Sequence, residues 1–221
     1  MADLFDRLRD GAAAEWSAYV DHPFVEGLAD GTLAPEAYRH YLIQDYLFLI
    51  QFARAYALGV YKSDSLAEMR AFSAGVASIL SEMSLHVRVC AGWGLAPDDL
   101  EAAAEARATI AYTRFVLDSG LRGDLLDLQV ALVPCIVGYA EIATALAARP
   151  GALDAANPYR DWIAEYAGTG YQEVAAKARA LLDASAERRL SEARMPQLVA
   201  LFGKACRLEA DFWQMGLDRA D

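Results

Sequence analysis

The chain has 221 residues, of which 56% are hydrophobic, and 31 acidic against 20 basic side chains give a formal net charge of −11 at pH 7. A chain of this length can bury a full core without help, and we expect residues 1–221 to form a single domain. The acidic balance disfavours binding to DNA or RNA, because affinity for a phosphate backbone comes chiefly from Lys and Arg side chains.

The cysteines and the N-terminal sequence indicate where the protein resides. Cys90, Cys135 and Cys206 are odd in number and form no CxxC pair, which favours reduced thiols over a disulfide framework. The first residues lack the basic region and apolar block of a signal peptide. Polar residues interrupt the most apolar run before it reaches the roughly 20 residues of a membrane span. We therefore expect a cytoplasmic protein.

Helical periodicity and helix-ending residues divide the chain into helices. Pro23 and Pro35 each stand where a helix begins, and the Ser63-Asp64-Ser65 stretch offers a cap for another. In chain order, the expected helices cover residues 4–20, the stretch after Pro23, and residues 36–62, 65–90, 97–117, 125–147, 159–167, 171–184 and 186–215. The sequence shows no alternating pattern of β-branched residues, no linker and no repeat. It therefore predicts an all-α, single-domain helical bundle.

The run over residues 125–147 is the most apolar part of the chain and contains Pro134, Cys135 and Tyr139. A cysteine in such a run is either a small core residue or a nucleophile in a pocket. The proline frees a backbone carbonyl near Val130 and kinks or restarts the helix. A restart would place Cys135 in a first helical turn, where the helix dipole lowers the pKa of the thiol.

Two other predicted helices carry a carboxylate among apolar residues at helical spacing. The two stripes are Tyr41, Asp45, Phe48 and Phe52, and Phe202, Cys206, Glu209 and Trp213. A carboxylate is costly to bury alone, so Asp45 must bind either a partner side chain or a ligand. Glu209 is either buried in the same way or partly exposed beside Arg207. Tyr112 and Tyr166 lie on apolar faces as core residues or as pocket walls.

The sequence offers little for metal or haem binding. The chain has three histidines: Glu82 and His86 stand one helical turn apart on one predicted helix, and His40 and Asp45 lie on another. A di-iron bundle needs two Glu-x-x-His motifs with further carboxylates, and that spacing is absent here. We therefore expect no metal and no cofactor.

From Trp16 to Trp213 the chain resembles the TenA family, the thiaminase II or aminopyrimidine aminohydrolase proteins. The cysteine places the chain with the cysteine-containing branch of that family. The resemblance is carried by a set of short motifs in a fixed order: His22-Pro23-Phe24, Gly31-Thr32-Leu33, Tyr41-Leu42-Ile43-Gln44-Asp45, Glu82-Met83-Ser84-Leu85-His86, Tyr112-Thr113, Leu132-Val133-Pro134-Cys135, Tyr139-Ala140-Glu141, Trp162-Ile163-Ala164-Glu165-Tyr166 and Glu209-Ala210-Asp211-Phe212-Trp213.

The resemblance implies a haem-oxygenase-like helical bundle without haem, assembled as a homotetramer. It implies hydrolysis of 4-amino-5-aminomethyl-2-methylpyrimidine to the hydroxymethylpyrimidine in thiamine salvage, with slower cleavage of thiamine. By position, Cys135 corresponds to the nucleophile and Glu209 to the proton donor. The substrate-binding positions implied in the same way are Asp45, Tyr139, Tyr112, Tyr166 and Phe48.

The chain departs from many relatives at one of these positions. Three residues after Asp45, where those relatives have a tyrosine thought to increase the nucleophilicity of the cysteine, it has Phe48. Two other functions stay open at this point. One is a regulatory or ligand-binding protein without catalysis, and the other is a cofactor-synthesis oxygenase on the same fold.

Overall fold

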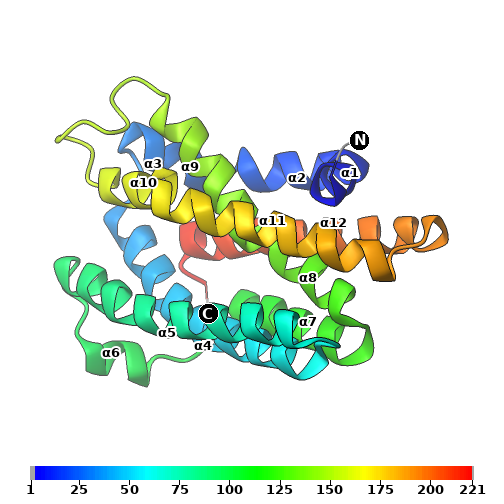
Figure 1. Cartoon of the computed structure of the whole chain (residues 1–221). Coiled ribbons are helices and arrows are strands. Elements are labelled where there is room, and N and C mark those ends of the chain that lie inside the picture. The colour runs from blue at the N-terminus through cyan, green and yellow to red at the C-terminus, as the bar shows by residue number, and fades with distance from the viewer. Residues whose placement is uncertain (1–2, 221) are drawn as a thin grey trace.

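The computed structural model describes residues 3–220, and every regular element in that range is a helix (Figure 1). The longer helices are α4, α5, α7, α11 and α12. The bounds in chain order are α1 Leu4–Gly11, α2 Ala13–Val20, α3 Pro23–Asp30, α4 Pro35–Lys62, α5 Leu66–Gly92, α6 Pro97–Ala102, α7 Arg107–Arg122, α8 Leu125–Val133, η1 Pro134–Gly138, α9 Tyr139–Ala147, α10 Arg160–Ala167, α11 Thr169–Arg189, η2 Glu192–Arg194 and α12 Met195–Asp218.

Several helices begin where the sequence supplies a cap. The His22 ring nitrogen Nδ1 accepts from the Phe24 amide at 3.2 Å, with Pro23 in the first turn of α3. Ser65 accepts from the Glu68 amide at the start of α5, at 3.2 Å. Each cap satisfies an amide that has no partner within its own helix.

Three predicted boundaries are wrong. The helix expected over residues 4–20 is two helices, α1 and α2, which are divided at Ala12. The helix expected over residues 97–117 is two helices, α6 and α7, separated by the extended residues 103–106. The Gln44 amide group holds that segment by donating to the Ala104 carbonyl at 3.0 Å and accepting from the Ala106 amide at 2.9 Å. The break expected near residue 185 lies at residues 190–194 instead, because α11 continues through an alanine-rich stretch that contains no helix breaker.

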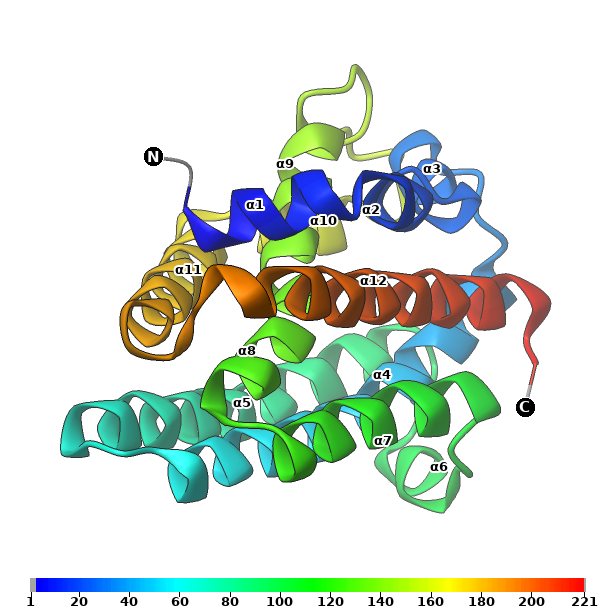
Figure 2. The same ribbon diagram turned by 90° about the vertical axis from the view of Figure 1, so that its right-hand side faces the viewer.

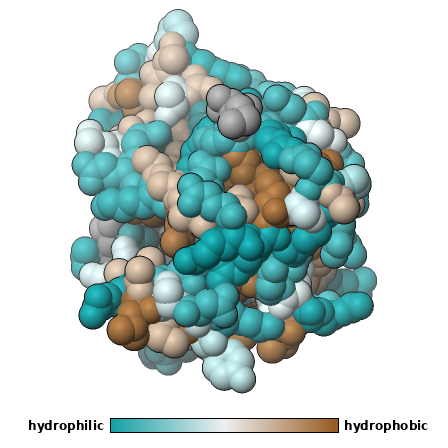
Figure 3. All heavy atoms as spheres, turned by 45° about the vertical axis from the view of Figure 1, so that its right-hand side comes forward, coloured by the Kyte–Doolittle hydropathy of each residue, from teal (hydrophilic) through white to brown (hydrophobic). Residues whose placement is uncertain are grey.

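The helix α12 runs through the middle of the molecule (Figure 2). It contacts α1 and α2 on one side and α4 and α7 on the other, while α8 packs across it. The buried residues of all these helices form one hydrophobic cluster. Most of the surface seen in Figure 3 is hydrophilic, and hydrophobic side chains show in a hollow near its centre.

The apolar run over residues 125–147 folds as one uninterrupted helical segment made of α8, η1 and α9. Leu125–Ala147 is long and apolar enough to cross a membrane, with a mean hydropathy of 1.8, but 72% of the tested window is buried inside the protein. This burial identifies the segment as a core helix.

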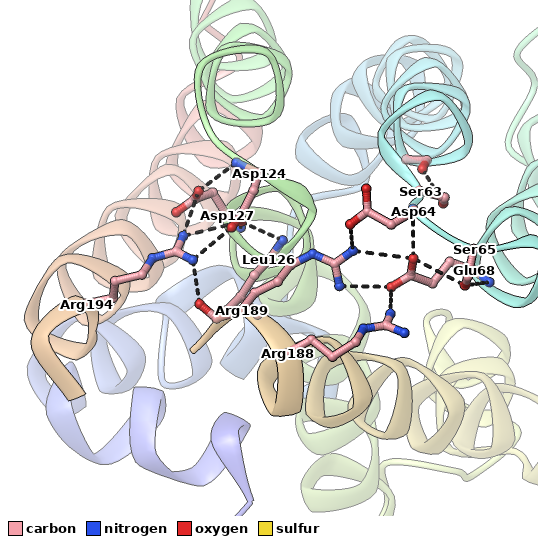
Figure 4. A network of polar contacts seen from close by, with 11 residues as sticks. Ser63, Asp64, Ser65, Glu68, Asp124, Leu126, Asp127, Arg188, Arg189 and Arg194 are labelled. Carbon is pink, nitrogen blue, oxygen red and sulfur yellow. Dashed lines mark hydrogen bonds and ion pairs between the residues drawn. The ribbon is translucent and has the colours of Figure 1, made fainter. Parts of the chain in front are cut away.

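Arginines of the α11–α12 turn tie three distant parts of the chain together (Figure 4). Arg194 contacts Asp124 at 2.8 Å and Asp127 at 2.9 Å at the start of α8. Arg189 contacts Glu68 at 2.9 Å at the start of α5, and Arg188 contacts the same carboxylate. The pairs of Arg194 fix the start of α8, the helix that leads to residue 135, and the pairs with Glu68 hold the start of α5 against the end of α11.

Candidate active site

Cys135 lies in η1, a single π-helical turn that begins at Pro134. Its neighbours Pro134 and Ile136 are buried, whereas Cys135 keeps some accessible surface. Two tyrosine hydroxyls from other helices donate to carbonyls of this turn: Tyr19 to Pro134 at 3.4 Å and Tyr171 to Cys135 at 3.5 Å. Such π-turns occur inside α-helices and are frequent at functional sites.

The close approach of Tyr19 depends on a glycine at the end of η1. A Cβ atom added at Gly138 would lie 2.4 Å from Tyr19 Cε1 and 2.6 Å from its hydroxyl oxygen. Only a residue without a side chain leaves that space free. Gly138 therefore allows the buried Tyr19 ring to pack directly on the turn that carries Cys135.

The thiol of Cys135 does not sit at a helix start. The helix neither stops nor restarts at Pro134, so the expected lowering of the thiol pKa by a local helix dipole is wrong. Burial raises the pKa of Cys135 well above its ordinary value, and the charges of Glu209 and Asp45 raise it further. In the free protein the sulfur is therefore held as a thiol.

Glu209 is fully buried on α12, so the sequence alternative of an exposed position is wrong. Arg207, two residues earlier, pairs instead with Glu15 at 2.8 Å. The hydroxyl of Tyr112 on α7 donates to Glu209 Oε1 at 2.8 Å. Burial raises the pKa of Glu209 to about 8, although the Tyr112 hydrogen bond opposes the rise and the charge of Asp45 adds to it. The carboxyl group is thus mostly protonated at neutral pH.

Asp45 is buried on α4 and meets a side chain of α5. The two atoms nearest each other are His86 Nδ1 and Asp45 Oδ2, 3.5 Å apart. Burial raises the pKa of Asp45, and the charge of His86 acts in the opposite direction. The sequence left open whether this carboxylate binds a partner side chain or a ligand, and in the structure the side chain that faces it is His86.

Aromatic rings surround these polar groups. Phe48 packs against Tyr112 with ring centroids 5.1 Å apart, and Tyr139 packs against Tyr166 at the same distance. Tyr166 also meets Tyr171 at 4.7 Å. Tyr139, Tyr112 and Phe48 are buried, whereas Tyr166 keeps partial exposure. All seven residues singled out from the sequence thus lie in one region built by α4, α7, η1, α9, α10 and α12.

Two cavities flank this region. A small cavity of about 20 Å³, partly open to solvent, lies between α4, α5, α8, η1 and α11, and its wall includes Ile136 and Tyr56. None of the seven predicted site residues lines it. A second cavity, of about 10 Å³, is lined in part by Phe48. Among residues 3–220, no group of three or more His, Cys, Asp or Glu side chains is placed to hold a metal ion.

Comparison with known proteins assigns the chain to a family. The model of the TENA/THI-4/PQQC family matches residues 10–219. The chain belongs to this family. An aminopyrimidine aminohydrolase from Halalkalibacterium halodurans is 39% identical over 210 residues, which cover 94% of this chain and 92% of that protein. The resemblance to TenA proteins deduced from the motifs is therefore confirmed.

Solved structures confirm the fold class. The crystal structure of a protein described as a TenA family transcription regulator, from a Silicibacter species, is 44% identical and superposes with a TM-score of 0.93, covering 98% of this chain and 97% of that chain. A Shewanella denitrificans domain with a haem oxygenase-like fold superposes with a TM-score of 0.77 at 16% identity, covering 99% and 94% of the two chains. The all-α, haem-oxygenase-like bundle expected of a TenA protein is the fold observed.

The structure adds two residues that sequence reasoning did not place in this TenA site. His86 was weighed as a metal ligand and named in one family motif, but it was not paired with Asp45, because its spacing from Glu82 reports only on its own helix. Tyr171, whose hydroxyl reaches the Cys135 carbonyl, follows the Gly168-Thr169-Gly170 break and carried no signal at all. Both contacts join residues far apart in sequence, which periodicity within one helix cannot reveal.

Proposed function

We propose that the protein is an aminopyrimidine aminohydrolase of thiamine salvage. It converts 4-amino-5-aminomethyl-2-methylpyrimidine and water to the hydroxymethylpyrimidine and ammonia, and it cleaves thiamine more slowly. The observation that carries this proposal is a thiol, Cys135, in the same aromatic region as a buried carboxyl group, Glu209, with a pKa of about 8. The Halalkalibacterium relative named for this activity supports it.

The amine of the substrate is a poor leaving group, so displacement by water alone is slow. In the proposed route the Cys135 sulfur adds to a carbon of the pyrimidine ring, and Glu209 gives its proton to a ring nitrogen. The thiol proton replaces the one that Glu209 gives up. The electron-rich ring then expels ammonia from the exocyclic methylene, whose amino group leaves from its protonated ammonium form as the carbon–nitrogen bond breaks. Water adds to the methylene and releases one proton, and loss of the thiolate, which takes up the proton on the ring nitrogen, restores the aromatic ring.

The remaining residues bind and orient the flat ring. Asp45, when ionised, accepts a hydrogen bond from the amino group on the pyrimidine. The rings of Tyr139, Tyr166 and Phe48 offer apolar walls of the kind that bind planar heterocycles. Phe48 lacks a hydroxyl, so in this protein it acts as a wall and gives no hydrogen bond to the thiol.

The test is to incubate the protein with the aminomethylpyrimidine and with thiamine in parallel, following ammonia and thiazole release. Cys135→Ser is expected to lose roughly three orders of magnitude or more in turnover, a loss at the upper end of what acid–base help alone supplies. Tyr61→Phe, which changes a ring that is exposed on the surface, is the control and keeps its turnover. Near-normal turnover by Cys135→Ser would reject covalent catalysis.

The proposal also covers assembly and the competing regulatory function. We propose that residues 1–221 act as one TenA-like domain within a homotetramer, which sedimentation equilibrium measures directly. The Silicibacter relative is described as a transcription regulator. The net charge of −11 disfavours DNA contact by this chain. A gel-shift titration at low salt is expected to show no complex, and a specific complex would favour regulation.

A further inference from the structure

Three groups of α4 hold the His86 ring from one side. Its Nε2 lies 3.0 Å from the Leu42 carbonyl oxygen, and its face stacks on Tyr46 with ring centroids 6.4 Å apart. Its Nδ1 lies 3.5 Å from Asp45 Oδ2. Positions 42, 45 and 46 share one face of a helix, so a single α5 side chain is oriented by one patch of α4.

This geometry settles where the ring carries a proton. A carbonyl oxygen only accepts, so Nε2 of His86 must bear hydrogen and donate to Leu42. In a neutral ring, Nδ1 then presents a lone pair to Asp45. Two acceptors that face each other at ion-pair distance are unfavourable, and a proton on one of them removes the conflict.

We propose that His86 is a positioning residue whose protonated Nδ1 keeps Asp45 ionised and aimed at the amino group of the pyrimidine. The role toward substrate rests on the proposed function, whereas the position of the proton does not. An ionised Asp45 accepts hydrogen bonds from the N–H groups of the substrate. A protonated Asp45 would donate its hydrogen to Nδ1 and would be a weaker acceptor for the substrate.

Burial raises the pKa of Asp45, and the charge of His86 is what opposes that rise. The side chains of Asp45 and His86 are only 8% and 11% exposed, so an unpaired carboxylate would be poorly solvated. The other titratable groups close to Asp45 are neutral or negative in all their forms: Tyr38, Tyr41, Cys90, Cys135, Tyr139, Tyr166 and Glu209. Among residues 3–220, His86 is the one cation that the structure pairs with Asp45.

Two substitutions distinguish this role from a purely structural contact between α4 and α5. The amide nitrogen of glutamine occupies a place near Nε2, so His86→Gln keeps the donor to Leu42 and loses the donor to Asp45. The amide nitrogen of asparagine occupies a place near Nδ1, so His86→Asn keeps the donor to Asp45 and loses the link to Leu42. The pair of variants thus removes one contact at a time.

His86→Gln is expected to raise KM for the aminomethylpyrimidine by about tenfold to a hundredfold, the loss of one hydrogen bond to a charged group, with a smaller effect on kcat. His86→Asn is expected to recover most of that loss. Thermal unfolding of both variants measures how much the contact between α4 and α5 contributes to stability. If His86→Asn binds substrate as poorly as His86→Gln, or worse, the positioning role is wrong.

A second measurement does not depend on turnover. In the full-length protein labelled with ¹⁵N-histidine, the three histidine rings give separate long-range ¹H–¹⁵N correlations, and loss of one set in His86→Asn assigns His86. Both ring nitrogens of His86 are expected at shifts of protonated nitrogen. An unprotonated Nδ1 would overturn the proposal even if the protein hydrolyses aminopyrimidines. Protonated nitrogens in a protein without that activity would instead reject only the proposed function.

Discussion

Glu209 has an environment that favours its neutral form. Its carboxyl group is fully buried, and its pKa of about 8 lies above that of a free glutamate. Between these two values the folded protein holds a proton that the unfolded chain has released. The free energy of unfolding therefore falls as pH rises through this window, by at most about 1.4 kcal/mol per pH unit from this group.

Glu209→Gln tests both consequences of that proton. In the unmodified protein, kcat is expected to decline above a pH of about 8, as Glu209 ionises. The glutamine variant is expected to bind substrate but to lose about a hundredfold or more in kcat, the usual contribution of an acid catalyst. Denaturant unfolding at several pH values should also lose part of its pH dependence. Equal kcat in both proteins would remove Glu209 from the acid role.

Tyr112→Phe tests the hydrogen bond at 2.8 Å that stabilises the ionised carboxylate. Without that donor, burial acts unopposed and the pKa of Glu209 rises. The decline of kcat on the alkaline side is therefore expected to move to higher pH. The control is Tyr61→Phe, which changes an exposed ring and leaves the profile in place. A shift to lower pH would contradict the assigned role of Tyr112.

Helical spacing among aromatic residues indicated burial for Asp45 and gave burial as one of two alternatives for Glu209, and the structure buries both. Their partners could not be predicted in the same way. His86 lies 44 residues from the carbonyl it binds, and Tyr112 lies 97 residues from Glu209. Contacts across helices depend on how α5 and α7 pack on α4 and α12, which periodicity along one helix does not report.

At the scale of the element, the π-turn at 134–138 depends on the missing side chain of Gly138. Gly138→Ala places a Cβ against the buried ring of Tyr19 and is expected to cost about 1–3 kcal/mol, as overpacking does. Turnover should fall with it, since the turn carries Cys135. Gly170→Ala is the control, because nothing lies within 4 Å of its added Cβ, and a gain of up to about 1 kcal/mol is expected there. Urea unfolding compares them, and equal stability would contradict the packing argument.

The arginine cluster in Figure 4 gives a second prediction for an element, the α4–α5 corner. The side chains of Glu68 and Arg189 are 6% and 9% exposed. Glu68→Gln removes the carboxylate that Arg188 and Arg189 share and leaves Arg189 paired with Asp64 alone, so it is expected to cost about 1.5–3 kcal/mol, the range for a hydrogen bond to a charged group. Glu173→Gln breaks an exposed pair with Lys177 and should change stability by less than about 1 kcal/mol. Similar effects of both changes on thermal unfolding would show that burial does not strengthen the Glu68 pair.

Helix positions were predictable where a proline, a cap or an apolar period marks them, as at α3, α4 and α10. Helix ends could not be predicted where a contact between distant parts of the chain determines them. The extended residues 103–106 are held by Gln44, and the α11–α12 turn is held by Arg194, which donates to the Arg189 carbonyl at 2.7 Å. Neither contact leaves a mark in the local sequence.

At the scale of the molecule, the fold class could be predicted from composition and family motifs. The site could not be predicted in that way, because it forms only when the helices pack together. Seven candidate residues are spread over six helical elements, from Asp45 on α4 to Glu209 on α12. They meet because α12 passes through the centre and packs on α4, α7 and α8. Folding of the complete bundle is therefore a condition for any activity, and no single helix carries the site.

The buried segment Leu125–Ala147 has a consequence for biosynthesis. It leaves the ribosome before α12, the helix that packs across it, has been made. During that interval the nascent chain displays 23 residues with the length and hydropathy of a membrane span. Asp127, Gln129 and Glu141 lower its affinity for lipid, since charged and polar groups resist transfer into a bilayer. These side chains thus help keep the unfinished chain out of the membrane until its own C-terminus covers it.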